Sequence, residues 1–253
     1  MEFMRAVCAE EVRWVLLEEG GLFWIGGDPF GEWARGPEVS SLAGIRFLSP
    51  CEPTKIIAVG LNYFSHAKEM GSPLPEEPVL FLKPPSSVVG HRDSVVYPRH
   101  LSHRVDYEGE LALVIGRRGR NIPREEAFEY VLGYTCANDV TARDLQRRDG
   151  QWTRAKGFDT FCPLGPAIAA DLEASCLMLT TRVNDRIRQR ASTSEMIFSV
   201  DALVSYISQV MTLEPGDVVL TGTPAGVGEL RPGDVVEVEI EGVGTLTNSV
   251  VEA

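Results

Sequence analysis

Short apolar runs that suit β-strands are the most regular feature of the chain. Residues 111–116 (LALVIG) and 217–222 (DVVLTG) are almost continuously apolar, which is typical of strands covered on both faces. Residues 55–60 (KIIAVG) form a similar run. Residues 235–242 (VVEVEIEG) alternate apolar and polar positions, which predicts a strand with one exposed face. Strands therefore dominate the predicted structure.

Two segments have a helical pattern instead. Residues 123–133 begin with Pro, which suits the first turn of a helix, and end with Gly. Residues 199–211 place their apolar side chains on one helical face, and the pattern stops before Pro215. With so few helices among so many strands, we predict an α+β fold that is mostly β, with a rolled or barrel-like sheet.

The first 49 residues differ from the remainder of the chain. They contain loosely alternating runs separated by Gly-rich turns, and residues 28–41 are rich in Gly, Pro and charge, as loops are. A new apolar strand pattern begins just after Pro53. We therefore expect a small N-terminal β-rich domain at 1–49 and a larger catalytic domain at 50–253.

Composition narrows the choice of partners. The chain of 253 residues has a formal net charge of −12, which argues against nucleic acid, because a phosphate backbone needs a basic surface. No apolar run approaches the roughly 18 residues of a membrane span, and the N-terminus lacks the pattern of a signal peptide. Five widely spaced cysteines without a CxxC motif favour reduced thiols in the cytoplasm over a zinc or redox site.

Three acidic residues are the strongest chemical signal. Glu108 and Glu110 lie two apart in VDYEGELALVIG, so their side chains share one face of a strand, and Asp139 follows in GYTCANDVTARD. A solvated strand face is the plain alternative, but the apolar neighbours indicate burial, where unpaired acids are costly. Because Mg²⁺ and Mn²⁺ prefer carboxylate oxygens, the pattern predicts a site for one of these ions.

A histidine and a lysine are candidate catalytic groups. His66 and Glu69 are three residues apart in GLNYFSHAKEMG, so on a helical turn the carboxylate would orient the imidazole as a general base. Taken alone, this pair is better interpreted as a surface histidine near a surface glutamate. Lys156 lies in WTRAKGFDTFCPLGP, where it could stabilise an enolate or oxyanion. A salt bridge from Lys156 to Asp159 or Asp144 is equally compatible with the sequence.

A glycine-rich stretch at residues 220–228 (LTGTPAGVG) completes the candidate chemistry. It lacks the Lys-Ser/Thr ending of a phosphate-binding P-loop and the spacing of a dinucleotide-binding loop. Its backbone N–H groups and threonines could bind a small carboxylate, or it could be a plain turn between strands.

Taken together, six segments resemble the fumarylacetoacetate hydrolase family, in its short bacterial branch. They run in order from about residue 55 to the C-terminus: GLNYFSHAKEMG, PVLFLKPPSSVVG, VDYEGELALVIG, GYTCANDVTARDLQ, WTRAKGFDTFCPLGP and GDVVLTGTPAGVG. The larger members of the family use a fourth acidic ligand upstream, and GLNYFSHAKEM contains no Asp. The resemblance implies a rolled mixed β-sheet and one Mg²⁺ or Mn²⁺ ion.

The same resemblance implies roles for individual residues. Glu108, Glu110 and Asp139 would bind the metal ion. Lys156, Gln146 and Thr223 would bind substrate, and His66 with Glu69 would form a dyad on a lid that orders when substrate arrives. Because the chain is acidic, we also expect Lys156 and either Arg143 or Arg147 to help the metal ion attract an anionic substrate.

These roles predict a metal-dependent enzyme of aromatic-compound catabolism that acts on a linear 2-oxo dicarboxylate. The favoured activities are 2-hydroxyhepta-2,4-diene-1,7-dioate isomerase and 5-oxopent-3-ene-1,2,5-tricarboxylate decarboxylase. Acylpyruvate hydrolase and oxaloacetate decarboxylase are the alternatives, and a non-catalytic carboxylate-binding protein is a more distant one. We expect a homodimer.

Overall fold

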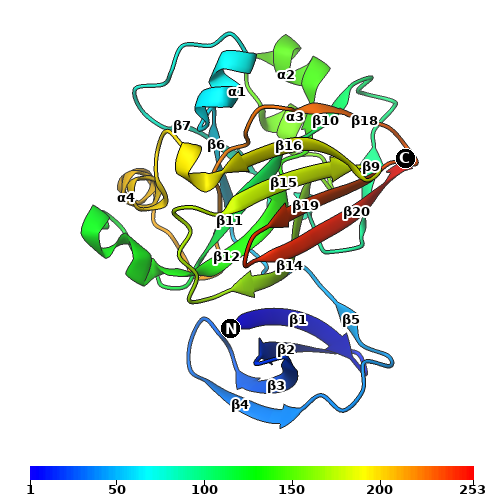
Figure 1. Cartoon of the computed structure of the whole chain (residues 1–253), viewed down its shortest axis with the longest axis vertical. Coiled ribbons are helices and arrows are strands. Elements are labelled where there is room, and N and C mark those ends of the chain that lie inside the picture. Colours follow the sequence, from blue (N-terminus) through cyan, green and yellow to red (C-terminus); the bar gives the residue numbers. More distant parts are fainter.

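Three β-sheets make up most of the molecule, in a computed structural model that describes residues 1–253 (Figure 1). The largest sheet has twelve strands, ten of them in the order β4-β3-β2-β1-β14-β12-β11-β17-β6-β7, while β5 pairs with β1 and β8 pairs with β14. These strands are β1 (Glu2–Cys8), β2 (Glu11–Glu18), β3 (Gly21–Gly27), β4 (Trp33–Glu38), β5 (Arg46–Phe47), β6 (Ile56–Gly60), β7 (Val79–Lys83), β8 (Val88–Val89), β11 (Gly109–Ile115), β12 (Val131–Asn138), β14 (Cys162–Ala169) and β17 (Val218–Leu220).

The two smaller sheets come from the catalytic part of the chain. One contains β13 (Thr141–Ala142), β10 (Val105–Tyr107) and β18 (Gly228–Leu230), in that order. The other contains β16 (Arg186–Ser192), β15 (Met178–Val183), β19 (Val235–Ile240), β20 (Gly244–Glu252) and β9 (Ser94–Tyr97). Parallel pairs such as β17 with β6 occur among antiparallel ones, so the predicted mostly β fold with mixed sheets is confirmed.

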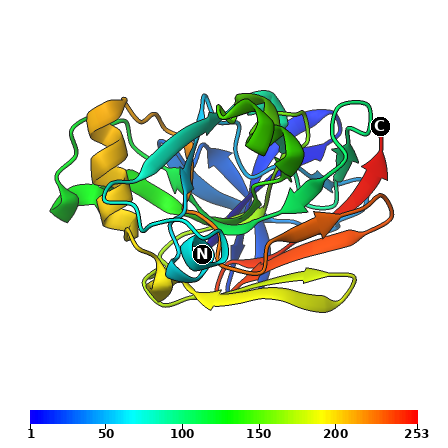
Figure 2. The same ribbon diagram turned by 90° about the horizontal axis from the view of Figure 1, so that it is seen from above.

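Helices are short and few. The α-helices are α1 (Phe64–Glu69), α2 (Arg143–Asp149), α3 (Thr153–Lys156) and α4 (Val200–Val210), and the 3₁₀ helices are η1 (Pro85–Ser87), η2 (Arg124–Tyr130) and η3 (Thr193–Glu195). None of them is both long and apolar enough to cross a membrane. Seen from above, α4 lies at one side of the molecule, away from the short helices α2 and α3 (Figure 2).

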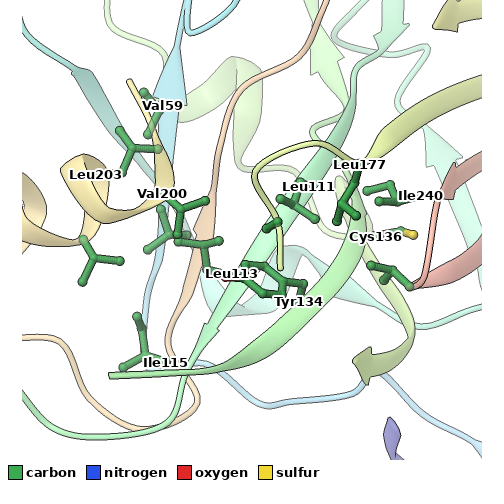
Figure 3. Packing of buried hydrophobic residues seen from close by; sticks show 14 of the residues in the cluster. Val59, Leu111, Leu113, Ile115, Tyr134, Cys136, Leu177, Val200, Leu203 and Ile240 are labelled. Carbon is green, nitrogen blue, oxygen red and sulfur yellow. The ribbon is translucent and has the colours of Figure 1, made fainter. Parts of the chain in front are cut away.

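Strand β11 is apolar without alternation because both of its faces are buried. Leu111, Leu113 and Ile115 point into a core that also contains α4 and β12, whereas Ala112 and Val114 pack into a second core on the opposite face. Figure 3 shows the first of these cores, where α4 contributes side chains from one face, as the spacing predicted. A strand that is buried on both faces must be apolar at every position.

The helix predicted over 123–133 is a 3₁₀ helix and not an α-helix, and the prediction is wrong for its last three residues. Residues Arg124–Tyr130 form only the 3₁₀ helix η2, and Val131 begins strand β12. Val131 pairs with Ile115 of β11, and Gly133 lies against the backbone of Ala169 in β14. Pairing with two neighbouring strands therefore outweighs the local helical signals of Pro123 and Gly133.

Residues 2–47 supply β1–β5, which lie together at one end of the molecule (Figure 1). They connect to the remaining strands of the large sheet where Glu2 and Phe3 of β1 pair with Ala169 and Ile168 of β14. The division of the chain near residue 50 stays a prediction.

Candidate active site

Strand register brings the three predicted acidic ligands together. Gly109 at the start of β11 pairs with Asn138 at the end of β12, so the residues flanking Gly109 lie beside Asp139. One carboxylate oxygen from each of Glu108, Glu110 and Asp139 lies within 4.8 Å of the others. We call these three residues the carboxylate cluster. Their exposed fractions are only 5%, 2% and 1%.

Gly109 is required by close contact between two sheets. A Cβ atom at this position would lie 2.0 Å from the side-chain oxygen of Thr181 in β15, a separation at which one residue must move. The glycine therefore lets the start of β11, with Glu108 just before the strand and Glu110 within it, pack directly against the five-stranded sheet.

Buried cations surround the carboxylate cluster. Lys156 Nζ donates to Glu108 Oε2 at 2.8 Å and to Asp139 Oδ2 at 2.5 Å. Arg143 pairs with Glu108 and, at 2.8 Å, with Asp106. Lys156 therefore pairs with members of the cluster, and neither Asp159 nor Asp144 is its partner.

Lys83 is a member of the site that the sequence analysis missed. It is 1% exposed, and its Nζ donates to Asp139 Oδ1 at 2.5 Å. The available signal was a lysine at the end of an apolar strand, VLFLK, just before two prolines. A lysine buried in such a strand needs a carboxylate partner, because an isolated buried charge is very costly.

The surroundings shift the pKa values of Glu108 and Glu110 in opposite directions. Burial by itself would raise the pKa of Glu108, but Lys156 and Arg143 hold that pKa well below its ordinary value. Burial and the neighbouring Asp139 and Glu108 carboxylates raise the pKa of Glu110 well above 4.5. Burial opposes the charge on Lys156, yet Asp139 and Glu108 outweigh it and raise its pKa. Counting Asp106, which shares Arg143, four buried carboxyl groups face two buried lysines and one buried arginine, and no cation pairs with Glu110.

The cluster suits a hard divalent cation. Its three oxygen donors converge at the adjoining ends of β11 and β12 and are shielded from bulk water. One of them, Glu110, has no cation partner in the protein. Carboxylates in this arrangement are the ligands preferred by Mg²⁺ and Mn²⁺. Glu108, Glu110 and Asp139 would hold the ion.

His66 and Glu69 meet on α1, as their spacing predicted. His66 Nδ1 lies 3.2 Å from Glu69 Oε2, and the imidazole is 6% exposed. The Nε2 atom of His66 has no protein partner, so it is free to accept a proton. A carboxylate at Nδ1 fixes the tautomer with the accepting lone pair on Nε2.

The glycine-rich loop at residues 220–228 binds carboxylates of the protein itself. Gly222 N donates to Glu110 Oε2 at 2.6 Å, and Gly226 N donates to Glu69 Oε1 at 3.0 Å. Ala225 N also donates to Ser65 Oγ on α1 at 3.3 Å. The loop therefore connects the carboxylate cluster to the helix that carries His66.

A cavity of about 220 Å³ opens between these groups. Eight of the nine predicted site residues line it, and Glu69 contributes from behind His66. The lining includes His66, Glu108, Glu110, Asp139, Arg143, Gln146, Lys156 and Thr223. One side of the cavity is apolar, which the sequence analysis did not predict; it is formed by Phe81, Trp152, Leu61 and Met70. The rings of Phe81 and Trp152 are in edge-to-face contact, with their centroids 5.2 Å apart.

The family model for the fumarylacetoacetate (FAA) hydrolase C-terminal domain matches residues 55–251, which contain the whole site. The chain belongs to the fumarylacetoacetate hydrolase family. Members of this family are enzymes with isomerase, hydrolase or tautomerase activities, and the resemblance seen in the six sequence segments is confirmed.

Relatives with named activities fall into several reaction classes. The chain is 42% identical to oxaloacetate tautomerase YisK of Bacillus subtilis over 92% of this chain and 84% of the relative. The structure of a 5-carboxymethyl-2-hydroxymuconate delta-isomerase from Mycobacterium smegmatis matches with a TM-score of 0.93 and 46% identity, covering 100% of both chains. A maleylpyruvate hydrolase from Sphingobium, solved with manganese (II) ion and pyruvate, matches with a TM-score of 0.81 and 30% identity over 100% of both chains.

Proposed function

We propose that this protein catalyses the keto–enol isomerisation of a short 2-oxo dicarboxylate, with oxaloacetate as the first candidate, and that it uses Mg²⁺ or Mn²⁺. The observation that carries the proposal is the position of His66. Its unpartnered Nε2 belongs to an imidazole that lines the same cavity as the carboxylate cluster. Tautomerisation needs one base beside one site that stabilises an enolate, and nothing more.

The proton transfer can be assigned to groups of the chain. His66 Nε2 would take a proton from C3 of the substrate, and the C–H electron pair would form the C2–C3 double bond as negative charge moves to the C2 oxygen. Glu69 stabilises the resulting imidazolium through Nδ1. A bound Mg²⁺ or Mn²⁺ would act as a Lewis acid on the 2-oxo group. The proton then returns to the C2 oxygen and gives the enol.

A free cation in the cavity favours a substrate with a second carboxylate. Arg147 lines the cavity from α2, four residues after Arg143, so the two side chains share a helical face. Arg143 is occupied by Asp106 and Glu108, whereas Arg147 makes no ion pair with the protein. The distal carboxylate of a dicarboxylate is a suitable partner for such an arginine. The sequence similarity to oxaloacetate tautomerase supports the same substrate class.

A second candidate is the isomerisation of 2-hydroxyhepta-2,4-diene-1,7-dioate, which the sequence analysis favoured. The apolar side formed by Phe81 and Trp152 suits the longer unsaturated chain of that substrate. Similarity to the structure of a 2-hydroxyhepta-2,4-diene-1,7-dioate isomerase from Mycobacterium marinum, with a TM-score of 0.91 and 44% identity, supports this candidate. In both reactions a base removes one proton from carbon and the proton returns to a different atom of the same enolate. His66 could therefore serve as the base in either reaction.

The test is the ultraviolet absorbance of the enol. Enol-form oxaloacetate is added to the protein with Mg²⁺ and, separately, with a chelator, and the loss of absorbance is followed by stopped flow. We expect the decay to accelerate only with the metal, without release of carbon dioxide. Release of carbon dioxide at the same rate would identify a decarboxylase instead. Acceleration with the dienedioate but not with oxaloacetate would favour the second candidate.

A further inference from the structure

A buried glutamine links the carboxylate cluster to the substrate side of the cavity. Gln189 lies in β16, an edge strand of the five-stranded sheet, and is 1% exposed although its neighbours Arg188 and Arg190 are exposed. Burying a carboxamide is unfavourable unless its hydrogen-bonding groups find partners. Those partners show what this side chain holds in place.

The orientation of the Gln189 amide is fixed by its partners. Its Oε1 accepts from Gly109 N at 3.0 Å, and a backbone N–H can only donate. Its Nε2 donates to Pro224 O at 2.9 Å and to Thr223 Oγ1 at 2.7 Å, and a carbonyl oxygen can only accept. In the flipped orientation, the amide nitrogen would face the N–H donor of Gly109, and the amide oxygen would face the carbonyl oxygen of Pro224. Only one orientation is therefore compatible with these contacts.

The orientation of the Thr223 hydroxyl follows from the same logic. Thr223 Oγ1 also contacts Gly109 O at 2.8 Å, and because that carbonyl can only accept, the hydroxyl must donate its hydrogen there. A hydroxyl has one hydrogen and two lone pairs, and Gln189 Nε2 occupies one lone pair. One lone pair is left. Thr223, which lines the cavity, therefore has only an acceptor to offer a ligand through its side chain.

The backbone around Thr223 adds to this constraint. Pro224 restricts Thr223 to extended conformations. Gly109, which both Gln189 and Thr223 bind, lies between Glu108 and Glu110 of the carboxylate cluster. Gln189 and the direct hydrogen bond from Thr223 to Gly109 O together set the position of Thr223 relative to the cluster.

We propose that Gln189 is a positioning residue that commits the Thr223 hydroxyl to accept hydrogen bonds, so that this side of the cavity recognises an O–H group of the ligand rather than a carboxylate. The inference rests on the proposed function for the nature of the ligand, since the enol form of a 2-oxo acid carries such an O–H group and the keto form does not. Gln189 would therefore contribute to distinguishing the two tautomers.

The experiment compares the binding of two small acids that need no turnover. Glycolate has a 2-hydroxyl group that can donate, and oxalate at neutral pH has none. Their affinities are measured by titration calorimetry in the presence of Mn²⁺ for the wild type, Gln189→Leu, Gln189→Met, Thr223→Val and Gln189→Leu/Thr223→Val. Gln209→Leu is the matched control, because Gln209 is an exposed glutamine on α4, a helix that contributes no residue to the cavity.

We expect Thr223→Val to weaken glycolate binding about 5- to 10-fold and oxalate binding less than about twofold, as expected for one lost hydrogen bond. Gln189→Leu frees the hydroxyl to turn and should lower the glycolate-to-oxalate affinity ratio to a similar extent. The double variant should equal Thr223→Val, because Gln189 acts through Thr223. The Gln209→Leu ratio should not change.

Two results would overturn the proposal. One is a glycolate-to-oxalate affinity ratio in Gln189→Leu that equals that of the wild type. The other is a fall in this ratio in the double variant that equals the product of the falls in the two single variants. If Gln189→Leu does not fold, Gln189→Met decides, since its side chain has nearly the length of Gln but no N–H group to donate to Thr223, and the same fall in the glycolate-to-oxalate ratio is expected. These binding ratios do not depend on turnover, so failure of the tautomerase assay alone leaves this test intact.

Discussion

The two sides of the cavity are held in different ways. The carboxylate cluster is fixed by buried ion pairs to Lys83, Lys156 and Arg143, on strands paired with neighbours on both edges. Helix α1 is attached to the glycine-rich loop by only two hydrogen bonds from backbone amides, at Ser65 and Glu69. Its outer face is open, with Phe64 54% and Met70 43% exposed.

Because of this difference, we expect the carboxylate cluster to determine metal binding and helix α1 to determine proton transfer. Rigid, buried carboxylates are preorganised to hold an ion before any substrate arrives. A short helix that buries only His66 and Ala67 and makes two hydrogen bonds to the glycine-rich loop can detach locally at lower cost than the paired strands. We therefore expect changes in the cluster to abolish both functions, and changes on α1 to affect only the chemical step.

The largest effect should come from Asp139→Asn. The substitution removes one anionic ligand and leaves Lys83 and Lys156 with a neutral partner, so we expect metal affinity to fall by more than about 100-fold and turnover to be lost. Mn²⁺ binding followed by electron paramagnetic resonance, together with the enol assay, measures both. Asp144→Asn, on α2 outside the cavity, is the control. Unchanged Mn²⁺ affinity in Asp139→Asn would show that the metal site is misassigned.

His66→Ala should separate the two sides of the cavity. General bases contribute about 100- to 10,000-fold, so we expect kcat to fall within that range while oxalate affinity in the presence of Mn²⁺ changes less than about threefold. Hydrogen exchange of residues 62–78 with and without oxalate and Mn²⁺ completes the comparison. Strong protection of this segment in both states would contradict a detachable helix and favour a fixed wall.

Arg147→Gln should have a smaller and selective effect. If Arg147 binds the distal carboxylate, we expect KM for oxaloacetate to rise roughly 5- to 10-fold, as for one charged hydrogen bond at a partly open site. Binding of pyruvate, which has no distal carboxylate, should not change. Arg148→Gln is the control, since Arg148 is the next residue of α2 and pairs with Asp149 on the surface. Equal effects on both acids would remove the argument for a dicarboxylate.

The smallest effect concerns the pH dependence of stability without metal. The pKa of Glu110 is raised in the folded protein above its ordinary 4.5, so the folded chain holds this proton more tightly than the unfolded chain. That stabilising contribution is complete below pH 4.5 and is lost as the pH rises through the raised value.

Glu110→Gln removes this titration and keeps an oxygen that can accept from Gly222 N. In the presence of a chelator, we expect the Tm of the variant to exceed that of the wild type at mildly alkaline pH by about 2–4 °C, corresponding to roughly 1 kcal/mol. The difference should disappear at acidic pH. Differential scanning calorimetry across pH measures it, and a constant Tm difference at all pH values would argue that Glu110 is not strained by its neighbours.

Much of the site could be predicted from the sequence because its signals are local. Two glutamates at i and i+2 in an apolar strand, and a histidine and glutamate at i and i+3 in a helical turn, are brought together by secondary structure alone. Apolar continuity in 111–116 likewise determined a strand buried on both faces. These features depend on the backbone period, which a short stretch of chain already contains.

Only the tertiary structure decided which groups from distant strands share the cavity. Lys83 at the end of β7 reaches Asp139, just past β12, although three strands lie between β7 and β12 in the large sheet. Gln189 reaches Gly109 because the five-stranded sheet packs against β11 where a Cβ atom has no room. Local signals also failed at 131–133, where strand pairing replaced the end of the expected helix. Spacing along the chain fixes contacts within one element, whereas strand order and sheet packing decide which buried charges and amides must find each other.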